Sequence, residues 1–525
     1  MRSTFHGLEV AKRGLYAQQT AISTAGHNIT NANTPGYSRQ RVNFSAAAAI
    51  DVPGLNRTYT PGQLGTGVTF SSIERMRERF LDDQFRHEAG SYGAWNVQKD
   101  VLEKLELIFG EPGETGMSSV IDAFWNAWQE LSREPENLEA RAVVKERSQA
   151  LLDVFQHADR KLTELKDDLS TNLDLKLTQA NTYIQQIAQL NGEIRRIENV
   201  GDQANDLMDQ RDLLVDKLAE LVQIDVKIGS DGLYEIALVN ADGSAGQVLV
   251  DENGPQFFQT TTDNTGTIDP LNTVTGGEIY GIIHSRDTLV AAYQEQLNAM
   301  FAGIIFGEVT VNIPAGSVLP VDVEDVDGHT YPAETAVPDG GIKVVVNGIN
   351  GLLQLGWTVR ENANGDAQQG VPLFDGFDEN NFSIQDVQLN DQIAHDLGMI
   401  AASFRIDDEG NVLKGNGDLA LAIAQLRDGE FQFGDEMSGT FDEYFRAVLG
   451  QLGVQTQEAT RQTNNQKVIL NAVDQRRMSV SGVSLDEEMT NLIQFQHAYN
   501  AAARMMTTLD QMFETIINRM GVVGR

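Results

Sequence analysis

Apolar residues recur every seven positions near both ends of the chain. The N-terminal repeat consists of Leu8, Leu15, Ile22 and Ile29. The C-terminal repeat consists of Leu485, Leu492, Tyr499, Met506, Phe513 and Met520, with Phe495, Ala502, Leu509 and Ile516 three positions further on. An apolar repeat of seven is typical of helices that pair along one seam. We therefore expect helices over residues 3–32 and 484–520.

Small residues give the first of these helices a second feature. Ala17, Ala21 and Ala25 form a stripe that would permit close approach of another helix, and Gln18 is a polar exception in the seam. The pattern leaves two interpretations open. Each helix packs on its own domain, or the two ends of the chain pair with each other as a coiled coil and present their outer faces to other copies. Repeats at both ends favour pairing.

The middle of the chain alternates between helical and strand patterns. Long Pro-free stretches favour helices. Near Ile224, Val226 and Ile228 the apolar positions take the period of two that marks a strand. Helices are expected over residues 73–109, 117–132, 137–199, 203–222, 286–306, 418–427 and 441–478. Residues 34–72 look extended, 308–372 look β-rich with a strand at 343–346, and 373–415 look mixed.

These elements predict a mainly α fold with inserted β structure. Three regions are expected. A terminal helical assembly domain combines residues 1–72 and 480–525. An elongated helical, rod-like domain combines 73–307 and 373–479 and contains a β-rich segment at about 224–285. Residues 308–372 form an inserted, acidic, β-rich outer domain.

Charge supports this division and excludes two classes of protein. The net charge is −36, and residues 308–436 hold five Lys or Arg against 23 Asp or Glu. Nucleic-acid and anionic-membrane binding depend on clustered basic residues, so we expect neither partner. The chain has no cysteine, which excludes disulfides and thiol chemistry. It has neither an apolar run long enough to span a membrane nor a recognisable signal peptide, so classical secretion is not expected.

Candidate catalytic and binding motifs are weak. His87-Glu88-Ala89-Gly90-Ser91 begins like a zinc-protease motif but lacks the second histidine. Gly415-Asn416-Gly417-Asp418 imitates a dinucleotide loop, although Asp418 as a helix N-cap explains it better. Asp325-Val326-Asp327-Gly328 imitates part of a calcium loop, but Val323 occupies the first ligand position. We therefore predict no enzyme, no catalytic or metal residues and no cofactor.

One motif predicts a turn and is also specific enough to indicate a protein family. The first helix runs into Asn31-Ala32-Asn33-Thr34-Pro35-Gly36-Tyr37-Ser38-Arg39-Gln40. This stretch, together with Gly7-Leu8-Glu9 and Ala17-Gln18-Gln19-Thr20-Ala21, resembles the N-terminal signature of the flagellar rod, hook and hook-associated axial proteins. Within that group it is most similar to the hook-associated protein 1 family. Ser481-Gly482-Val483-Ser484-Leu485-Asp486-Glu487-Glu488 is similar to the C-terminal helix of that family.

The resemblance implies a secreted structural component of the extracellular bacterial flagellum, located at the junction between hook and filament. It implies a ring of copies whose terminal helices build the inner tube, with the hook protein and the second hook-associated protein as neighbours. Export would use the flagellar type III channel, with a chaperone on the C-terminal helix. The expected assembly surface is Leu8, Leu15, Ile22, Ile29, Asn31, Asn33, Pro35, Gly36, Tyr37, Leu485, Leu492, Phe495, Tyr499, Met506, Leu509, Phe513 and Ile516.

Two alternatives remain at this point. The chain is another axial protein, either the hook protein or the second hook-associated protein, or it is a secreted adhesin or enzyme whose activity lies in the acidic middle. The continuation Ser38-Arg39-Gln40 and the long helix at 137–199 argue against the other axial proteins. The composition shift at residues 308–372 is the only feature that motivates an adhesin or enzyme.

Overall fold

The computed structural model describes residues 5–49, 64–110, 116–229, 232–260, 266–361, 367–407, 410–433 and 437–519. The predicted seam position Met520 lies outside these residues. The chain divides into two compact units. Unit 1 comprises residues 1–95, 174–281 and 462–525, and unit 2 comprises 96–173 and 282–461. Four helices contribute residues to both: the long helices α2 (Arg79–Phe109), α4 (Leu138–Glu198) and α12 (Phe441–Ser481), and the short α7 (Gly277–His284).

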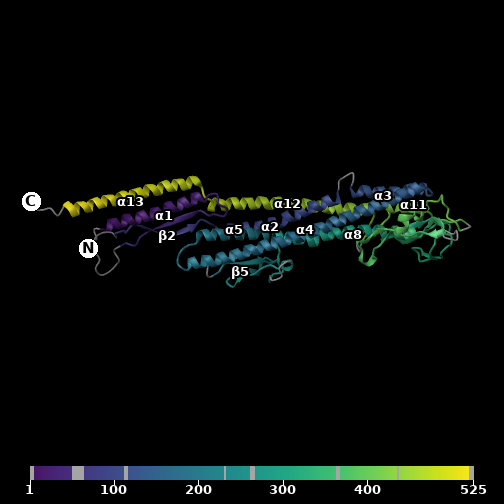
Figure 1. Ribbon diagram of the computed structural model, residues 1–525, viewed down its shortest axis with the longest axis horizontal. Coiled ribbons are helices and arrows are strands. Elements are labelled where there is room, and N and C mark those ends of the chain that lie inside the picture. Colours follow the sequence, from purple (N-terminus) through teal and green to yellow (C-terminus); the bar gives the residue numbers. More distant parts are fainter. Residues whose placement is uncertain are drawn as a thin grey trace, which may run out of the picture. The chain divides into compact units, whose positions relative to one another are not determined.

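Unit 1 is built around helices from three distant parts of the sequence. Its other helices are α1 (His6–Thr30), α5 (Asn205–Leu221), α6 (Pro270–Thr273) and α13 (Leu485–Arg519). Helices α1 and α13 lie side by side (Figure 1, purple and yellow). The two ends of the chain therefore pair, as the apolar repeats predict.

A two-stranded hairpin follows α1. Strand β1 (Gln40–Ala46) pairs antiparallel with β2 (Val68–Arg75), and Gln40 lies opposite Arg75. The register shifts between Asn43 and Phe44, which marks a bulge. The hairpin returns the chain to the end of α1, where the Pro-Gly-Tyr motif lies.

Unit 1 also contains a four-stranded sheet. Its strands are β3 (Ile224–Ile228), β4 (Tyr234–Val239), β5 (Ala245–Asp251) and β6 (Gly254–Pro255), in that order. The strand period that begins at Ile224 is thus correct. The helical segment that the sequence predicts from residue 286, however, begins at Gly277. Ile279 and Ile282, three residues apart, are both fully buried, so this apolar run has the helical period.

Unit 2 combines helices with small antiparallel sheets. Its helices are α3 (Met117–Arg133), the π-helical turn η1 (Ser285–Val290), α8 (Ala291–Phe306), α9 (Gly348–Gln354), α10 (Asp391–His395) and α11 (Asp418–Gln425), with short 3-10 turns η2 (Glu379–Asn381), η3 (Ile384–Asp386), η4 (Leu397–Met399) and η5 (Leu426–Asp428). Phe124, Trp125 and Trp128 of α3 are buried, and Phe155 stacks on Phe301 at 4.6 Å. Aromatic packing therefore forms much of this core.

The main sheet of unit 2 joins distant segments in the order β10-β7-β15-β16. Its strands are β7 (Glu308–Ile313), β10 (Ile342–Asn347), β15 (Phe431–Phe433) and β16 (Met437–Gly439). The small sheets pair β8 (Val323–Glu324) with β9 (Thr330–Tyr331), β11 (Trp357–Glu361) with β12 (Ala367–Gln369), and β13 (Phe374–Asp375) with β14 (Gln388–Leu389). A strand does occupy residues 343–346, as predicted.

The predicted fold class is confirmed: the chain is mainly helical, contains inserted β structure and pairs its terminal helices. A second local prediction is also wrong. Gly417 is the N-cap of α11, and Asp418 is its first helical residue. The Asp418 carboxylate accepts hydrogen bonds from Phe404 N at 2.8 Å and Arg405 Nε at 3.2 Å. Within the described ranges, none of the helices combines the length and apolarity needed to span a membrane.

Candidate assembly interface

Helices α1 and α13 run antiparallel in a constant register. A Cβ atom placed on Gly7 would lie 3.1 Å from Leu509 Cδ1, and one placed on Gly14 would lie 3.6 Å from Ala502 Cβ. A step of seven residues along α1 therefore matches a step of seven back along α13. At the open end of the pair, the rings of Phe5 and Phe513 stack with centroids 5.1 Å apart. This repeat of seven is the geometry of a coiled-coil seam.

Small residues form the innermost part of the seam on α1. Ala11, Ala17, Ala21 and Ala25 are each at most 2% exposed. The predicted seam residues Leu8, Leu15, Ile22 and Ile29 are only half-buried. Alanine allows closer helix approach than a branched side chain, so the stripe of alanines occupies the contact and the larger residues flank it.

The predicted residues of α13 divide into two groups. Leu492, Phe495, Tyr499, Met506, Leu509 and Phe513 are half-buried. Leu485 and Ile516, near the two ends of the helix, are each 50% exposed. Phe495 also contacts Phe44 of the hairpin, edge to face at 6.2 Å. The structure therefore brings the first group together with α1 and the hairpin and leaves the second group largely open to solvent.

A buried asparagine joins the three elements that meet at the end of this seam. Asn28 of α1 is 1% exposed. Its Nδ2 donates to Gln40 O at 2.8 Å and to Glu488 Oε2 at 3.0 Å. Its Oδ1 accepts from Tyr37 Oη at 2.7 Å and from Gln40 N at 2.9 Å. One side chain thus links α1, the start of β1 and the first turns of α13.

Arg39 adds further contacts between the turn and the start of α13. Its Nε lies 2.7 Å from Glu488 Oε1, and its Nη1 lies 2.8 Å from Glu487 Oε2. The backbone N–H of Arg39 donates to Ser481 O at 2.8 Å. Because Glu488 is almost completely buried, its ion pair with Arg39 and its hydrogen bond from Asn28 satisfy both carboxylate oxygens. We call Asn28, Tyr37, Arg39, Gln40 and Glu488 the clasp.

The remaining predicted motif residues shape the turn that leads into the clasp. Asn31 ends α1, and its side chain donates to His27 O at 3.1 Å. Gly36 has a φ of +79°, and a Cβ there would lie 2.9 Å from Leu213 Cβ, so glycine is required on two grounds. Asn33 and Pro35 are exposed.

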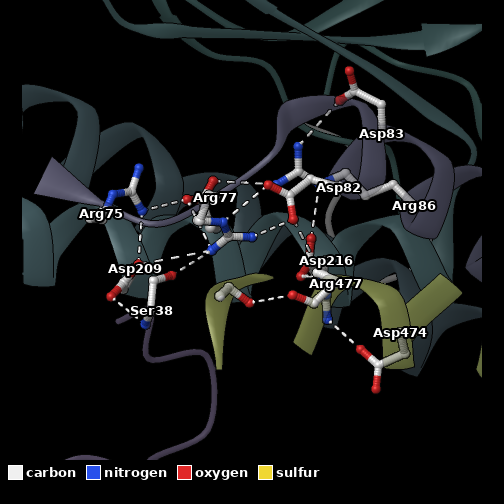
Figure 2. A network of polar contacts seen from close by, with 12 residues as sticks. Ser38, Arg75, Arg77, Asp82, Asp83, Arg86, Asp209, Asp216, Asp474 and Arg477 are labelled. Carbon is white, nitrogen blue, oxygen red and sulfur yellow. Dashed lines mark hydrogen bonds and ion pairs between the residues drawn. The ribbon is translucent and has the colours of Figure 1, made fainter. Parts of the chain in front are cut away.

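Charged residues from the N-terminal, middle and C-terminal segments of unit 1 form one network (Figure 2). Arg75 Nη1 lies 2.8 Å from Asp209 Oδ1, and Arg77 Nη2 lies 2.7 Å from Asp82 Oδ1. Asp216 accepts from Arg86 Nε at 2.8 Å and from Arg477 Nη1 at 2.5 Å. The clasp connects to this network through Ser38, whose N–H donates to Asp209 Oδ2 at 2.8 Å.

The electrostatics of the network depend on a central carboxylate, Asp212, which is 1% exposed. Burial acts to raise its pKa, but the nearby guanidinium groups of Arg77, Arg75 and Arg86 outweigh burial and hold the pKa well below its usual range. For Asp209, burial prevails over the hydrogen bond from Ser38 and raises the pKa. Burial also raises the pKa of the Tyr37 hydroxyl, so Tyr37 remains a hydrogen-bond donor to Asn28.

Sequence reasoning identified the turn but missed Asn28, Arg39 and Glu488 as the residues that fix it. Asn28 and Glu488 are 460 positions apart, and no local pattern connects them. The sequence offers one indication of the role of Asn28, because it lies on the apolar side of an amphipathic helix. A buried amide side chain at such a position needs hydrogen-bond partners. In the described parts of the chain, no three His, Asp or Glu side chains gather so that they could hold a metal ion.

Three family models match the chain. Residues 102–307 match the flagellar hook-associated protein FlgK helical domain. Residues 8–37 match the flagella basal body rod protein family, and residues 474–520 match the C-terminal family of the flagellar basal body rod FlgEFG proteins. The two rod-protein matches contain most of α1, the turn and α13.

Whole-chain relatives give the same result. Flagellar hook-associated protein 1 of Bacillus subtilis (strain 168) is 34% identical over 533 residues, covering 100% of both chains. The protein of the same name from Escherichia coli (strain K12) is 26% identical over 553 residues, covering 97% of this chain and 98% of the other. The solved structure of the flagellar hook junction protein FlgK from Burkholderia pseudomallei superposes with a TM-score of 0.50 at 15% identity, covering 76% of this chain and 100% of that one, and supports the fold.

Proposed function

Because the chain belongs to the flagellar hook-associated protein 1 family, we propose that it is a structural component of the bacterial flagellum at the junction between hook and filament. The observation that carries this proposal is the 34% identity to the Bacillus subtilis relative along the full length of both proteins. The relatives described above bear the names of structural flagellar proteins, which supports a role without catalysis. Its place would be extracellular, in the axial structure.

We further propose that copies assemble through the surface formed by α1, the turn and α13. Two features support this. The seam and the clasp fix the two helices against each other, so that they offer one rigid surface. Several large apolar side chains of α13 remain exposed, among them Met489 at 57% and Ile517 at 72%. Exposed apolar side chains gathered on one element mark an interaction surface.

The proposed partners are other copies of this chain, the hook protein, the second hook-associated protein and an export chaperone on α13. The matches to rod-protein families at both ends support contact with axial components. We also propose that the chain has the three domains predicted from its sequence and that the predicted assembly residues lie at the contacts between copies.

Deletion of residues 485–525 tests the function. In a strain that carries only the truncated chain, we expect hooks without filaments. Immunogold labelling of the full-length chain should mark one narrow band between hook and filament. Normal filaments on the truncated chain, or label along the whole filament, would refute the proposal.

A further inference from the structure

A small cleft opens beside the clasp, between the two terminal helices and the hairpin. It measures about 200 Å³, and four clasp residues form one part of its wall. The full lining is Ala21, Thr24, Ala25 and Asn28 of α1, Arg39, Gln40, Arg41 and Val42 at the start of the hairpin, and Glu488, Asn491 and Phe495 of α13. A cavity of about 150 Å³ with apolar walls can hold a molecule the size of benzene. The cleft is therefore large enough to receive one apolar side chain.

The opposite face of α13 presents such side chains at the same level. Met489 is 57% exposed and Ile493 is 50% exposed. Residues two apart on an α-helix differ by about 200° in direction. Met489 and Ile493 alternate along the helix with Asn491 and Phe495, so they point away from the cleft but lie within about 6 Å of it along the helix axis.

The Met489 face and the cleft also carry charged side chains of opposite sign. Asp486 precedes Met489 by three positions and Ile493 by seven, so it lies on the face of those two residues. Arg41 lines the cleft and lies opposite Glu74 in the pairing of β1 with β2. The Arg41 and Asp486 side chains are both exposed, and no ion pair is formed by either one within the described ranges. A contact that places the Met489 face in a cleft would also place Asp486 near Arg41.

We infer that the Met489–Ile493 face of one copy occupies the cleft beside Ala21, Val42 and Phe495 of the next copy. The inference rests on the proposed function and specifies how neighbouring copies meet. Two complementary surfaces on opposite faces of one molecule give a head-to-tail contact, which closes into a ring or continues as a helix. The occupant is a second copy because one chain supplies both the apolar side chains and the complementary cleft. Methionine suits the role, since its flexible side chain fills irregular gaps.

Cysteine crosslinking tests the inference, because the chain has no cysteine of its own. Val42→Cys and Ile493→Cys are placed in separate, differently tagged copies that are expressed together, so that a crosslink between them must join two molecules. Junctions are isolated from cells and treated with a short bifunctional maleimide. The matched control replaces Val42→Cys with Val200→Cys, which is 81% exposed and lies outside α13 and the cleft.

We expect mixed dimers from the Val42–Ile493 combination at no less than ten times the control yield. Arg41→Cys with Asp486→Cys is the second combination and should give the same result at solvent-exposed positions, where folding is not at risk. If junctions assemble and both combinations crosslink no more than the control, the inference is overturned. If full-length protein is absent from junctions, the proposed function itself fails, so the two failures are distinguishable.

Discussion

Asn28 shows how a single side chain can organise the meeting point of three elements. It is buried and uses both oxygen and nitrogen in four hydrogen bonds, to Tyr37, Gln40 and Glu488. Replacing it would leave the Tyr37 hydroxyl, the Gln40 backbone and one Glu488 oxygen without a partner. A buried polar group without a partner costs about 1–3 kcal/mol.

We therefore expect Asn28→Ala to destabilise the clasp by about 3 kcal/mol. Hydrogen exchange followed by mass spectrometry should show faster exchange in β1 and in the first turns of α13. Asn33→Ala is the matched control, because Asn33 lies in the same turn and is exposed. Equal exchange in the two variants would show that the clasp does not hold these elements.

Asp212 makes a second residue-scale prediction, which depends on pH. Its pKa is lowered in the folded state by Arg77, Arg75 and Arg86, so its stabilising effect is fully present above the unfolded pKa of about 3.9 and is lost as pH falls through the lower folded value. Asp212→Asn should cost about 3–5 kcal/mol at pH 7, because it removes the buried carboxylate that these three guanidinium groups share.

The difference in unfolding free energy between the wild-type chain and Asp212→Asn should stay constant from pH 7 to about 5 and shrink below about pH 4. Urea unfolding at a series of pH values measures it. Asp202→Asn, which replaces an exposed carboxylate in a loop of unit 1, is the control. A difference that grows as pH falls would contradict the assignment of Asp212 as the paired, ionised centre.

Single residues were the least predictable level of the structure. The motif from Pro35 to Gln40 identifies a special turn, and the glycine requirement at Gly36 follows from its geometry. Glu488, which contacts both Arg39 and Asn28, lies more than 400 positions from each of them, so this part of their role depends on tertiary structure that local patterns do not contain.

At the scale of elements, the close contact between α1 and α13 depends on small side chains. Apolar periodicity correctly predicts that both helices exist and pair. It assigns the centre of the seam to Leu8, Leu15, Ile22 and Ile29, whereas the alanines are the most buried residues of α1. Periodicity finds the apolar side of a helix, but the residue at closest approach is decided by the crossing geometry of both partners.

Ala21→Leu tests this geometry. Ala21 is 1% exposed and follows Gly14, which faces Ala502, by one step of seven, so the added carbon atoms must push the helices apart, at a cost of about 1–3 kcal/mol. Limited chymotrypsin digestion should cut α13 faster in this variant than in the wild-type chain. Gln19→Leu adds a leucine on the exposed side of the same helix and should leave the digestion rate unchanged. Equal rates for the two variants would mean that the alanine stripe is not in the contact.

At the scale of the whole molecule, the chain forms two units from interleaved segments. The boundaries at residues 95/96, 173/174 and 461/462 fall inside α2, α4 and α12. Such boundaries carry no Pro- or Gly-rich linker that a sequence could reveal. The sheet that joins β7 and β10 to β15 likewise depends on a pairing across more than a hundred residues. Composition predicts that the middle of the chain is acidic and contains strands, but it does not indicate which strands pair.

Removing residues 485–525 should therefore affect the two units differently. Unit 2 contains none of these residues, so its peptides in the ranges 96–173 and 282–461 should keep their hydrogen-exchange protection. Helix α1 loses the partner that covers its alanine stripe and should exchange rapidly, since an isolated helix of this kind depends on packing. Loss of protection throughout unit 2 would show that the units do not fold separately.

The central claim is that the two ends of one chain pair antiparallel in a fixed register, and a designed disulfide tests it most directly. A Cβ at Gly14 would lie 3.6 Å from Ala502 Cβ, within the range of about 3.5–4.5 Å that a disulfide requires. We predict that Gly14→Cys with Ala502→Cys forms an intramolecular disulfide on mild oxidation, identified by mass spectrometry of the linked peptides. Gly14→Cys with Leu509→Cys, seven residues out of register, should remain reduced. A disulfide in the second pair and none in the first would contradict the claim.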